Sequence, residues 1–180
     1  MNPIEINRLE HIRKEYGQMI IEAAARWKHR PEVIAGIMMQ ETQGGLSLLL
    51  DKQGPEGRGD KGADGIRHGH GLMQIDNRWF ADFIRSGDWK DPECNISKGC
   101  AILAGKRSFL THRLQHIGFT SEEIERATIA AYNAGEGRVM KAVKAGQDPD
   151  YYTAHGNYSK SVLRYADAYL QLDDEEEESS

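Results

Sequence analysis

Apolar residues recur every three or four positions along much of this chain, and this spacing predicts helices. One series occupies the first 27 residues: Ile6, Leu9, Ile12, Tyr16, Met19, Ile20, Ala23 and Trp27. A second series starts at Pro31, a residue that suits the first turn of a helix, and the glycine pair at 44–45 ends it. We therefore expect a long helix followed by a shorter one.

Capping signals mark further helices. Asp91 can cap a helix whose first turn contains Pro92, and Thr120 with Glu123 has the spacing of a capping box. A last apolar series comprises Tyr158, Val162, Tyr165 and Tyr169. These signals predict a mainly α fold with five or six helices.

A glycine-rich stretch separates the second helix from the later ones. Residues 44–71 contain nine glycines and few large apolar side chains, and the stretch runs into the motif GHGLMQID at 69–76. We expect at most a small β-sheet there. A loop of this length inside a compact domain is more often functional than not.

Composition indicates a soluble globular chain. The 180 residues are 39% hydrophobic and 28% charged, and no apolar run approaches the roughly 18 residues that span a bilayer. We expect a single domain over residues 1–172, followed by a disordered acidic tail at 173–180. The tail holds six of the 28 acidic residues, so the remaining 22 nearly balance the 23 basic ones. The sequence contains no block of basic residues that would indicate nucleic-acid binding.

The polar N-terminus and the two cysteines bear on the compartment. Residues 1–17 lack the apolar core of a signal peptide, so we expect synthesis in the cytoplasm without one; a signal removed beforehand is the alternative. Cys94 and Cys100 fall six apart in a predicted helix, which separates their Cα atoms by roughly 9 Å. That is too far for an unstrained disulfide, so we expect two free, buried thiols and a reducing compartment.

Histidine pairs raise the question of a metal site. His68 and His70 lie two apart, and His112 and His116 lie four apart on a predicted helix. No third ligand with suitable spacing accompanies either pair. We therefore expect neither a metal nor a cofactor.

One carboxylate lies on the apolar face of the second helix. Ile34, Ile37 or Met38, and Glu41 follow at helical spacing, so Glu41 shares a face with core residues. Partial desolvation there raises the pKa of a carboxyl group, which is what a general acid requires. The alternative is a helix-end glutamate that reaches solvent or pairs with a base.

The motifs around Glu41 resemble the lysozyme superfamily, specifically goose-type lysozymes and soluble lytic transglycosylase domains. Five matching segments follow in the family's order: QETQGG (40–45), GHGLMQID (69–76), DPECNISKGCAIL (91–103), TIAAYNAGEGRV (128–139) and NYSKSVLRYADAYL (157–170). The resemblance implies a lysozyme-like fold, a helical bundle around a substrate cleft. It also implies that Glu41 protonates the glycosidic oxygen between N-acetylmuramic acid and N-acetylglucosamine in peptidoglycan.

The resemblance leaves the second half of the reaction open. Goose-type lysozymes carry aspartates that position water, whereas lytic transglycosylases close an anhydro ring with the sugar's own 6-hydroxyl. Asp76 stands where goose-type enzymes have one aspartate. Counting back for the other without a gap gives Gly65; Asp64 matches if one residue is inserted, and Asp60 is a further option. We favour Asp76 and Asp64, against the alternatives that Asp64 is a turn residue and Asp76 a helix cap.

The same resemblance implies which residues bind the glycan. Gln74, Tyr132 and Asn133 would line the cleft, Tyr158 would close in on the acid, and His70 lies inside a matching segment. The alternative for the tyrosines is that they are core aromatics whose hydroxyl groups find partners.

Together these features predict a monomeric goose-type muramidase that hydrolyses the β-1,4 bond of peptidoglycan with inversion and neither inserts into a membrane nor binds nucleic acid. It would act on the bacterial cell wall, and a phage endolysin released at lysis is the setting that the sequence favours. A lytic transglycosylase is the nearer alternative, and a catalytically silent peptidoglycan-binding domain is the second.

Overall fold

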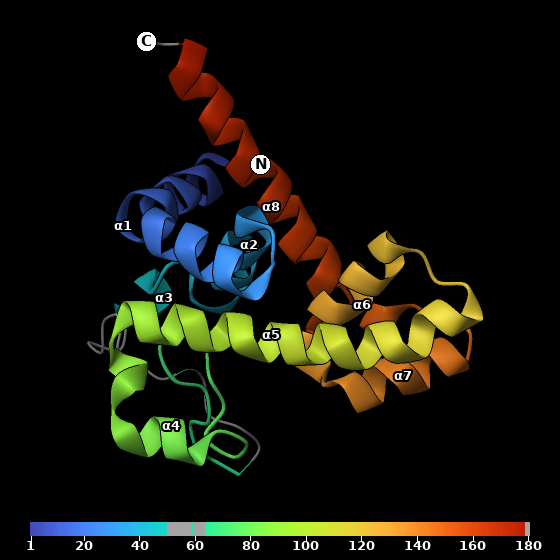
Figure 1. Cartoon of the computed structure of the whole chain (residues 1–180). Coiled ribbons are helices and arrows are strands. Elements are labelled where there is room, and N and C mark those ends of the chain that lie inside the picture. Colours follow the sequence, from blue (N-terminus) through green and yellow to red (C-terminus); the bar gives the residue numbers. More distant parts are fainter. Residues whose placement is uncertain (50–58, 60–63, 179–180) are drawn as a thin grey trace. The chain divides into compact units, whose positions relative to one another are not determined.

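The structure, a computed structural model, describes residues 1–49, 59 and 64–178, with side chains in 1–48, 59 and 64–172. It is mainly helical (Figure 1), as predicted. Its α-helices are α1 (Pro3–Trp27), α2 (Pro31–Thr42), α3 (Leu46–Leu49), α4 (Ala81–Ser86), α5 (Pro92–Leu114), α6 (Ser121–Ala134), α7 (Glu136–Lys144) and α8 (Tyr158–Glu178). Short 3-10 turns are η2 (Asp88–Lys90), η3 (Gln115–Ile117), η4 (Pro149–Tyr152) and η5 (Ala154–Gly156).

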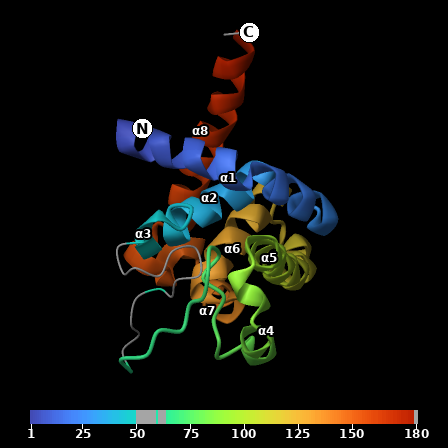
Figure 2. The ribbon, with the colours of Figure 1, turned by 90° about the vertical axis from the view of Figure 1, so that its left-hand side faces the viewer.

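The helix count over the described residues exceeds the five or six predicted, because α3, α4 and α7 are too short for apolar spacing to reveal. The same residues contain no strand, and only single bridge pairings occur at Arg67 and His70. Between α3 and α4 the described chain runs through loops and turns (Figure 2).

The chain divides into two compact units. The first comprises residues 1–100 and the chain from Tyr165 onward, and the second comprises residues 101–164. Helices α5 and α8 each contribute to both. Our prediction of one catalytic domain over residues 1–172 stays a prediction.

In the first unit, α1 packs against α2. A capping box starts α1, because the side chain of Asn2 accepts from the Glu5 backbone N–H while the Glu5 carboxylate accepts from that of Asn2. The helix therefore begins before the apolar series that predicted it. Fully or almost fully buried side chains supply the core of this unit: Leu9, Ile12, Ile20, Ile34, Ile37, Met38, Leu72, Met73, Ile75 and Ile96.

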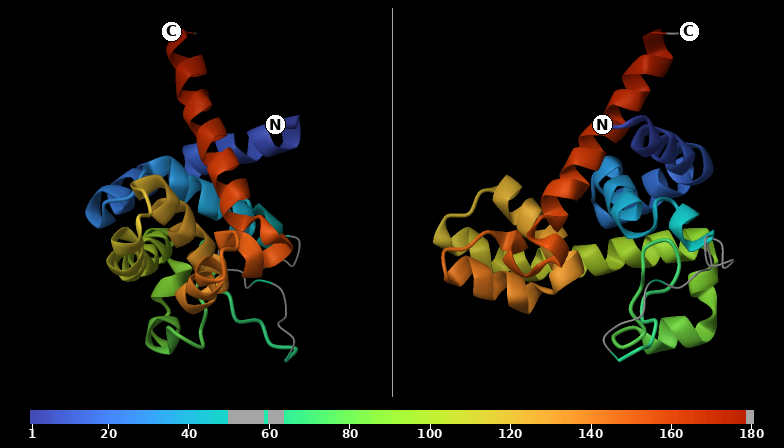
Figure 3. Two further views of the ribbon diagram at one scale, coloured as in Figure 1. Left: turned by 90° about the vertical axis from the view of Figure 1, so that its right-hand side faces the viewer. Right: turned by 180° about the vertical axis from the view of Figure 1, so that it is seen from behind.

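In the second unit, α6 and α7 lie side by side (Figure 3, yellow to orange). The predicted capping box of Thr120 and Glu123 is present at the start of α6. A cluster of buried residues joins the helices of this unit: Leu110, Leu114, Ile124, Ala127, Ala130, Ala131, Ala134 and Val139.

Both cysteines are free and lie on α5, but only one is buried as predicted. Cys100 is fully buried, and burial raises the pKa of its thiol to about 12. Cys94 is exposed in the first turn of α5, because it lies on the outer side of that turn, whereas the neighbouring Asn95 is buried. The predicted cap of this helix is confirmed, since the Cys94 backbone N–H donates to the Asp91 carboxylate at 2.8 Å.

The acidic C-terminal segment continues α8 as helical backbone to Glu178. Its last two residues, 179–180, lie outside the described residues, so the prediction of a disordered tail from residue 173 stays a prediction. Within the part of the chain that the structure describes, no helix is long and apolar enough to cross a membrane.

Candidate active site

Glu41 is the penultimate residue of α2. The preceding stretch, residues 33–39, is buried throughout, whereas Glu41 is partly exposed. The helix ends directly after it because Gln43 adopts a left-handed conformation with φ of 55°. Glu41 thus stands where a buried helix reaches the surface, a position that fits both the general acid and the helix-end glutamate considered as its alternative.

The neighbouring Thr42 joins this helix end to the GLMQ segment at 71–74. Thr42 is fully buried, and its hydroxyl donates to the backbone oxygen of Leu72 at 2.8 Å. The same hydroxyl oxygen accepts from the Gly45 backbone N–H at 3.1 Å. Because Thr42 is adjacent to Glu41, these bonds fix the backbone that carries the carboxylate against the GLMQ segment.

Asn95, on α5, holds the other side of the same segment. Its side-chain oxygen accepts from the Met73 backbone N–H at 2.8 Å, and its amide nitrogen donates to the backbone oxygens of His70 and Trp89. Asn95 is 1% exposed, so water cannot replace these bonds. Gly71 makes this contact possible: it has φ of 69°, and a Cβ there would lie 2.2 Å from the Asn95 amide nitrogen.

Gln74 is held by the glycine-rich loop. It has a positive φ of 49°, and its amide nitrogen donates to the Gly71 backbone oxygen at 2.8 Å. A Cβ at Gly59 or at Gly69 would come within 2.2 Å of the Gln74 side-chain oxygen. The side chain therefore fits between two glycine backbones, an arrangement that fixes the loop whether or not Gln74 also contacts a ligand.

His70 is buried in the turn that presents Gln74. Only 3% of it is exposed, its Nδ1 donates to the His68 backbone oxygen at 2.8 Å, and its ring packs edge-on against Trp89. The backbones of His70 and Ile75 exchange two hydrogen bonds of 3.0 Å across the turn. This burial favours a packing role for His70 over direct contact with a substrate.

Asp76 is paired with Arg78. Its carboxylate accepts from the Arg78 backbone N–H at 2.8 Å and from the guanidinium at 2.5–3.1 Å. Partial burial acts to raise the pKa of Asp76, but the hydrogen bonds and charge of Arg78 outweigh it and hold that pKa below its usual value. Asp76 does not cap α4, because the residue flanking that helix is Phe80.

Asp64 lies four residues before His68 and is bound to it. The Asp64 Oδ2 accepts from the His68 Nε2 at 2.7 Å, and its Oδ1 accepts from the Ile66 backbone N–H at 3.0 Å. The bond from His68, followed by that from Ile66, lowers the pKa of Asp64. The His68 Nδ1 lies 2.8 Å from the side-chain oxygen of Asn77, the residue after Asp76. The two aspartates therefore belong to one polar cluster.

The second unit holds the other three predicted residues. Tyr132 is half-buried near the end of α6, and Asn133 beside it is exposed. The Asn133 side-chain oxygen accepts from the Ala154 backbone N–H at 2.9 Å. Tyr158, the first residue of α8, is only 2% exposed.

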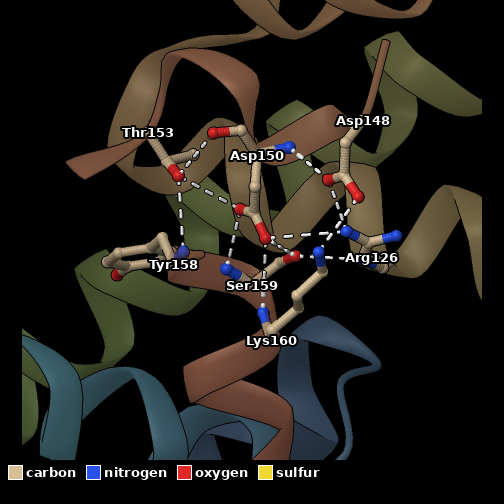
Figure 4. A network of polar contacts seen from close by, with 7 residues as sticks. All are labelled: Arg126, Asp148, Asp150, Thr153, Tyr158, Ser159 and Lys160. Atoms are coloured by element: carbon tan, nitrogen blue, oxygen red, sulfur yellow. Dashed lines mark hydrogen bonds and ion pairs between the residues drawn. The ribbon is translucent and has the colours of Figure 1, made fainter. Parts of the chain in front are cut away.

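A buried carboxylate that the sequence analysis missed anchors the start of α8 (Figure 4). Asp150 is fully buried; it accepts from the Ser159 backbone N–H at 2.9 Å and hydroxyl at 2.7 Å, and from the Thr153 hydroxyl at 3.2 Å. A carboxylate at a helix N-terminus also meets the positive end of the helix dipole. The Arg126 guanidinium lies 3.7 Å from it.

Asp148 supports this network from its exposed side (Figure 4). Its carboxylate pairs with Arg126 and, at 3.2 Å, with Lys160. The hydrogen bond from Arg126 holds the pKa of Asp148 far below its usual value. In the sequence, Asp148 and Asp150 belong to the triplet DPD at 148–150, a pattern that is typical of a turn.

The predicted residues thus divide between the two units. The first unit holds Glu41, Asp64, His70, Gln74 and Asp76, and the second holds Tyr132, Asn133 and Tyr158. Asp60 lies outside the described residues. Among the residues described, no three histidine, cysteine or acidic side chains are grouped so as to hold a metal ion.

Comparison with known proteins identifies the family of this chain. A protein-family model described as Lysozyme g matches residues 6–172. The chain is 31% identical over 141 residues to Lysozyme G of Dromaius novaehollandiae, covering 78% of this chain and 59% of that protein. For Lysozyme g of Casuarius casuarius the identity is also 31%, and 65% of that protein is covered. With Lysozyme g of Epinephelus coioides it is 30% identical over 158 residues, 87% of this chain and 75% of the fish protein.

This chain therefore spans less than two thirds of the two bird proteins. The family match nevertheless covers almost all of it and includes every predicted site residue. The ordered motifs, the helical fold and these relatives agree, and the chain belongs to the Lysozyme g family.

Proposed function

We propose that this chain is a muramidase that hydrolyses the β-1,4 bond between N-acetylmuramic acid and N-acetylglucosamine in peptidoglycan. Membership of the Lysozyme g family supports the substrate class. The observation that carries the proposal is the position of Glu41, at the surface end of buried helix α2, with the adjacent Thr42 bonded to Leu72 of the GLMQ segment.

In this proposal Glu41 is the general acid. Its proton passes to the glycosidic oxygen as the bond between that oxygen and the anomeric carbon breaks, which stabilises an oxocarbenium-like transition state. A partly buried carboxyl group on an apolar helix face retains its proton more readily than one in water. Thr42 keeps the backbone of the acid in place during this step.

The aspartates would position the attacking water molecule and accept its proton. An inverting enzyme places water between the acid and a second carboxylate, with the two carboxyl groups roughly 6.5–9.5 Å apart. Water attacks the anomeric carbon and gives its proton to that carboxylate. Hydrogen bonds from His68 and Arg78 lower the pKa values of Asp64 and Asp76, so both are ionised at neutral pH and can accept from water.

Replacement of the acid tests the proposal. Glu41→Gln removes the proton donor while keeping the size of the side chain, so release of soluble fragments from purified peptidoglycan should fall by about 10²–10⁴-fold. Glu10→Gln, a matched change at an exposed position of α1, should leave the rate near that of the wild type. Retained activity in Glu41→Gln, with its folding confirmed by circular dichroism, would refute the assignment.

One observation favours a second candidate, a lytic transglycosylase. That reaction needs no water base, since the 6-hydroxyl of the muramic acid attacks instead. Asp76 is engaged by Arg78 through several hydrogen bonds, which weakens it as a base, and Asp64 is one residue out of the gap-free register. The masses of the products separate the two reactions.

The remaining expectations from the sequence stay predictions. These are the endolysin role, cytoplasmic synthesis without a signal peptide, the monomeric state and the silent glycan-binding alternative. Gln74, Tyr132, Asn133 and Tyr158 stay proposed binding residues, and the burial of Tyr158 favours a part in fixing the start of α8.

A further inference from the structure

We propose that His68 is a positioning residue that ties the Asp64 carboxylate to the segment bearing Asp76, and that the tie is complete only when both ring nitrogens of His68 carry a proton. The catalytic use of the tie rests on the proposed function, because Asp64 and Asp76 are its proposed water-positioning residues. The tie itself exists without substrate and can be measured without activity.

The geometry of the imidazole ring carries the proposal. His68 Nε2 lies 2.7 Å from Asp64 Oδ2, and its Nδ1 lies 2.8 Å from the Asn77 side-chain oxygen. A carboxylate and an amide oxygen are both acceptors, so each ring nitrogen must donate. A neutral imidazole has one N–H and can make only one of these bonds. The two bonds together require the imidazolium form.

The backbone places His68 between the two aspartates. The Asn77 backbone N–H donates to the His68 backbone oxygen at 3.0 Å, and Asn77 directly follows Asp76. His68 is therefore held to the Asp76 segment by its main chain whatever its charge. The Asp64 carboxylate, with half of its side-chain surface exposed, is linked to that segment through the His68 ring, and the positive charge of the imidazolium strengthens this link.

The charges around the ring favour the imidazolium. The bond to Asn77 and then that to Asp64 raise the pKa of His68, against partial burial and the like charge of Arg78. Asp76 is a second acidic group close enough to interact with the ring, and it pairs with Arg78. The side chain of His68 is 13% exposed, which limits competition from water.

The tie is compatible with the register of Asp64. A gap-free match to goose-type lysozymes would place the first aspartate at position 65, where this chain has glycine. Asp64 stands one residue farther from Asp76, and the His68 ring reaches across to it through the Nε2 bond. Without the ring, the Asp64 carboxylate would keep its bond from the Ile66 backbone N–H but would lose this link to the Asp76 segment.

Titration of the ring is the first test. The His68 ring protons are followed by NMR from pH 4 to 9 and assigned by their loss in His68→Gln. The wild-type midpoint should lie above the ordinary histidine value of about 6.5. It should fall in Asp64→Asn, which removes the carboxylate charge. A midpoint at or below the ordinary value that does not move in Asp64→Asn would overturn the tie.

The pH profile is the second test. In the wild type, kcat should decline on the alkaline side at the midpoint found by NMR, because loss of the ring proton leaves one N–H for two acceptors and removes the positive charge that holds Asp64. His68→Gln should lower kcat several-fold, with KM little changed, and should lack that decline. His116→Gln, a matched change at an exposed histidine of the second unit, should keep both the rate and the profile. An unchanged kcat and profile in His68→Gln would overturn the positioning role.

The two tests also separate this proposal from the proposed function. A wild type that titrates as predicted but releases no fragments at any pH refutes the hydrolase and the catalytic use of the tie. An active wild type whose His68 titrates normally refutes the tie alone. Should His68→Gln fail to fold, Asp64→Asn replaces it, since loss of the carboxylate must remove the same alkaline decline.

Discussion

The two candidate aspartates stand in different surroundings although they share one polar cluster. Asp76 is half-buried and paired with an arginine two residues away, whereas Asp64 is exposed and paired with a histidine. Arginine keeps its charge across the accessible pH range, but histidine does not. The setting of Asp76 is therefore fixed, and that of Asp64 depends on pH.

Removing the charge of Asp76 should show whether this residue activates the water molecule. Asp76→Asn keeps the acceptor for the Arg78 backbone but lacks the carboxylate, so hydrolysis should fall by about 10²-fold or more. The measurement is the rate of reducing-end release from peptidoglycan. A wild-type rate in this variant would exclude Asp76 as a water base, and Asp82→Asn on α4 provides an exposed control.

The Asp76–Arg78 pair also predicts that the stability of the protein depends on pH in the acidic range. The pKa of Asp76 is lowered in the folded state, so the pair stabilises the protein above the unfolded value of about 3.9 and loses this effect as the pH falls through the folded value. The difference in Tm between wild type and Arg78→Gln should shrink over that acidic range. A difference that stays constant down to pH 2 would contradict the pairing.

Among the elements, the helices with local signals were predicted well. The caps of α5 and α6 lie within three residues of the groups they satisfy, so the sequence shows them directly. The contacts that assemble the candidate site are different. Thr42 reaches Leu72 across 30 positions, and Asn95 reaches His70 across 25. No local spacing reveals such pairs, because only the folded chain brings them together.

The turn at residues 70–75 should not tolerate a side chain at Gly71. Gly71→Ala would place a Cβ against the Asn95 amide and strain a φ of 69°, so it should destabilise the protein by about 1–3 kcal/mol. Gly105→Ala, in an exposed helical position with open space around it, should be neutral or slightly stabilising. Thermal denaturation compares the two. Equal Tm values would contradict the close packing of the turn.

The start of α8 should depend on Asp150. Asp150→Ala leaves the buried backbone N–H and hydroxyl of Ser159 without their acceptor, so it should cost about 3–5 kcal/mol. Asp167→Ala, at an exposed position farther along α8, should change stability by less than about 0.5 kcal/mol. Chemical denaturation measures both variants. A small loss in Asp150→Ala would mean that the buried carboxylate does not hold this helix.

For the whole molecule, the sequence predicted the helical class from the recurring spacing of apolar residues and the family from five motifs in a fixed order. It missed the burial of His70 and the exposure of Cys94, since neither follows from spacing alone. The interior network around Asp150 looked like a turn for the same reason: burial of a polar residue depends on what packs over it.

The acidic segment should be dispensable for catalysis. It contains none of the proposed site residues and follows Tyr169, the last buried residue among those of α8 whose side chains the structure describes. Deleting residues 173–180 should therefore leave the rate of peptidoglycan cleavage within a few-fold of the full chain. A large loss of rate, with Tm unchanged, would assign the segment a part in catalysis or substrate binding.

In the proposed reaction, Glu41 and the aspartates direct water to the glycosidic bond. Mass spectrometry of purified peptidoglycan digested by the wild type tests this reaction, with Glu41→Gln as the control. We expect fragments with ordinary reducing muramic acid ends from the wild type and almost none from Glu41→Gln. Fragments lighter by one water, with 1,6-anhydro ends, would contradict it and establish a lytic transglycosylase.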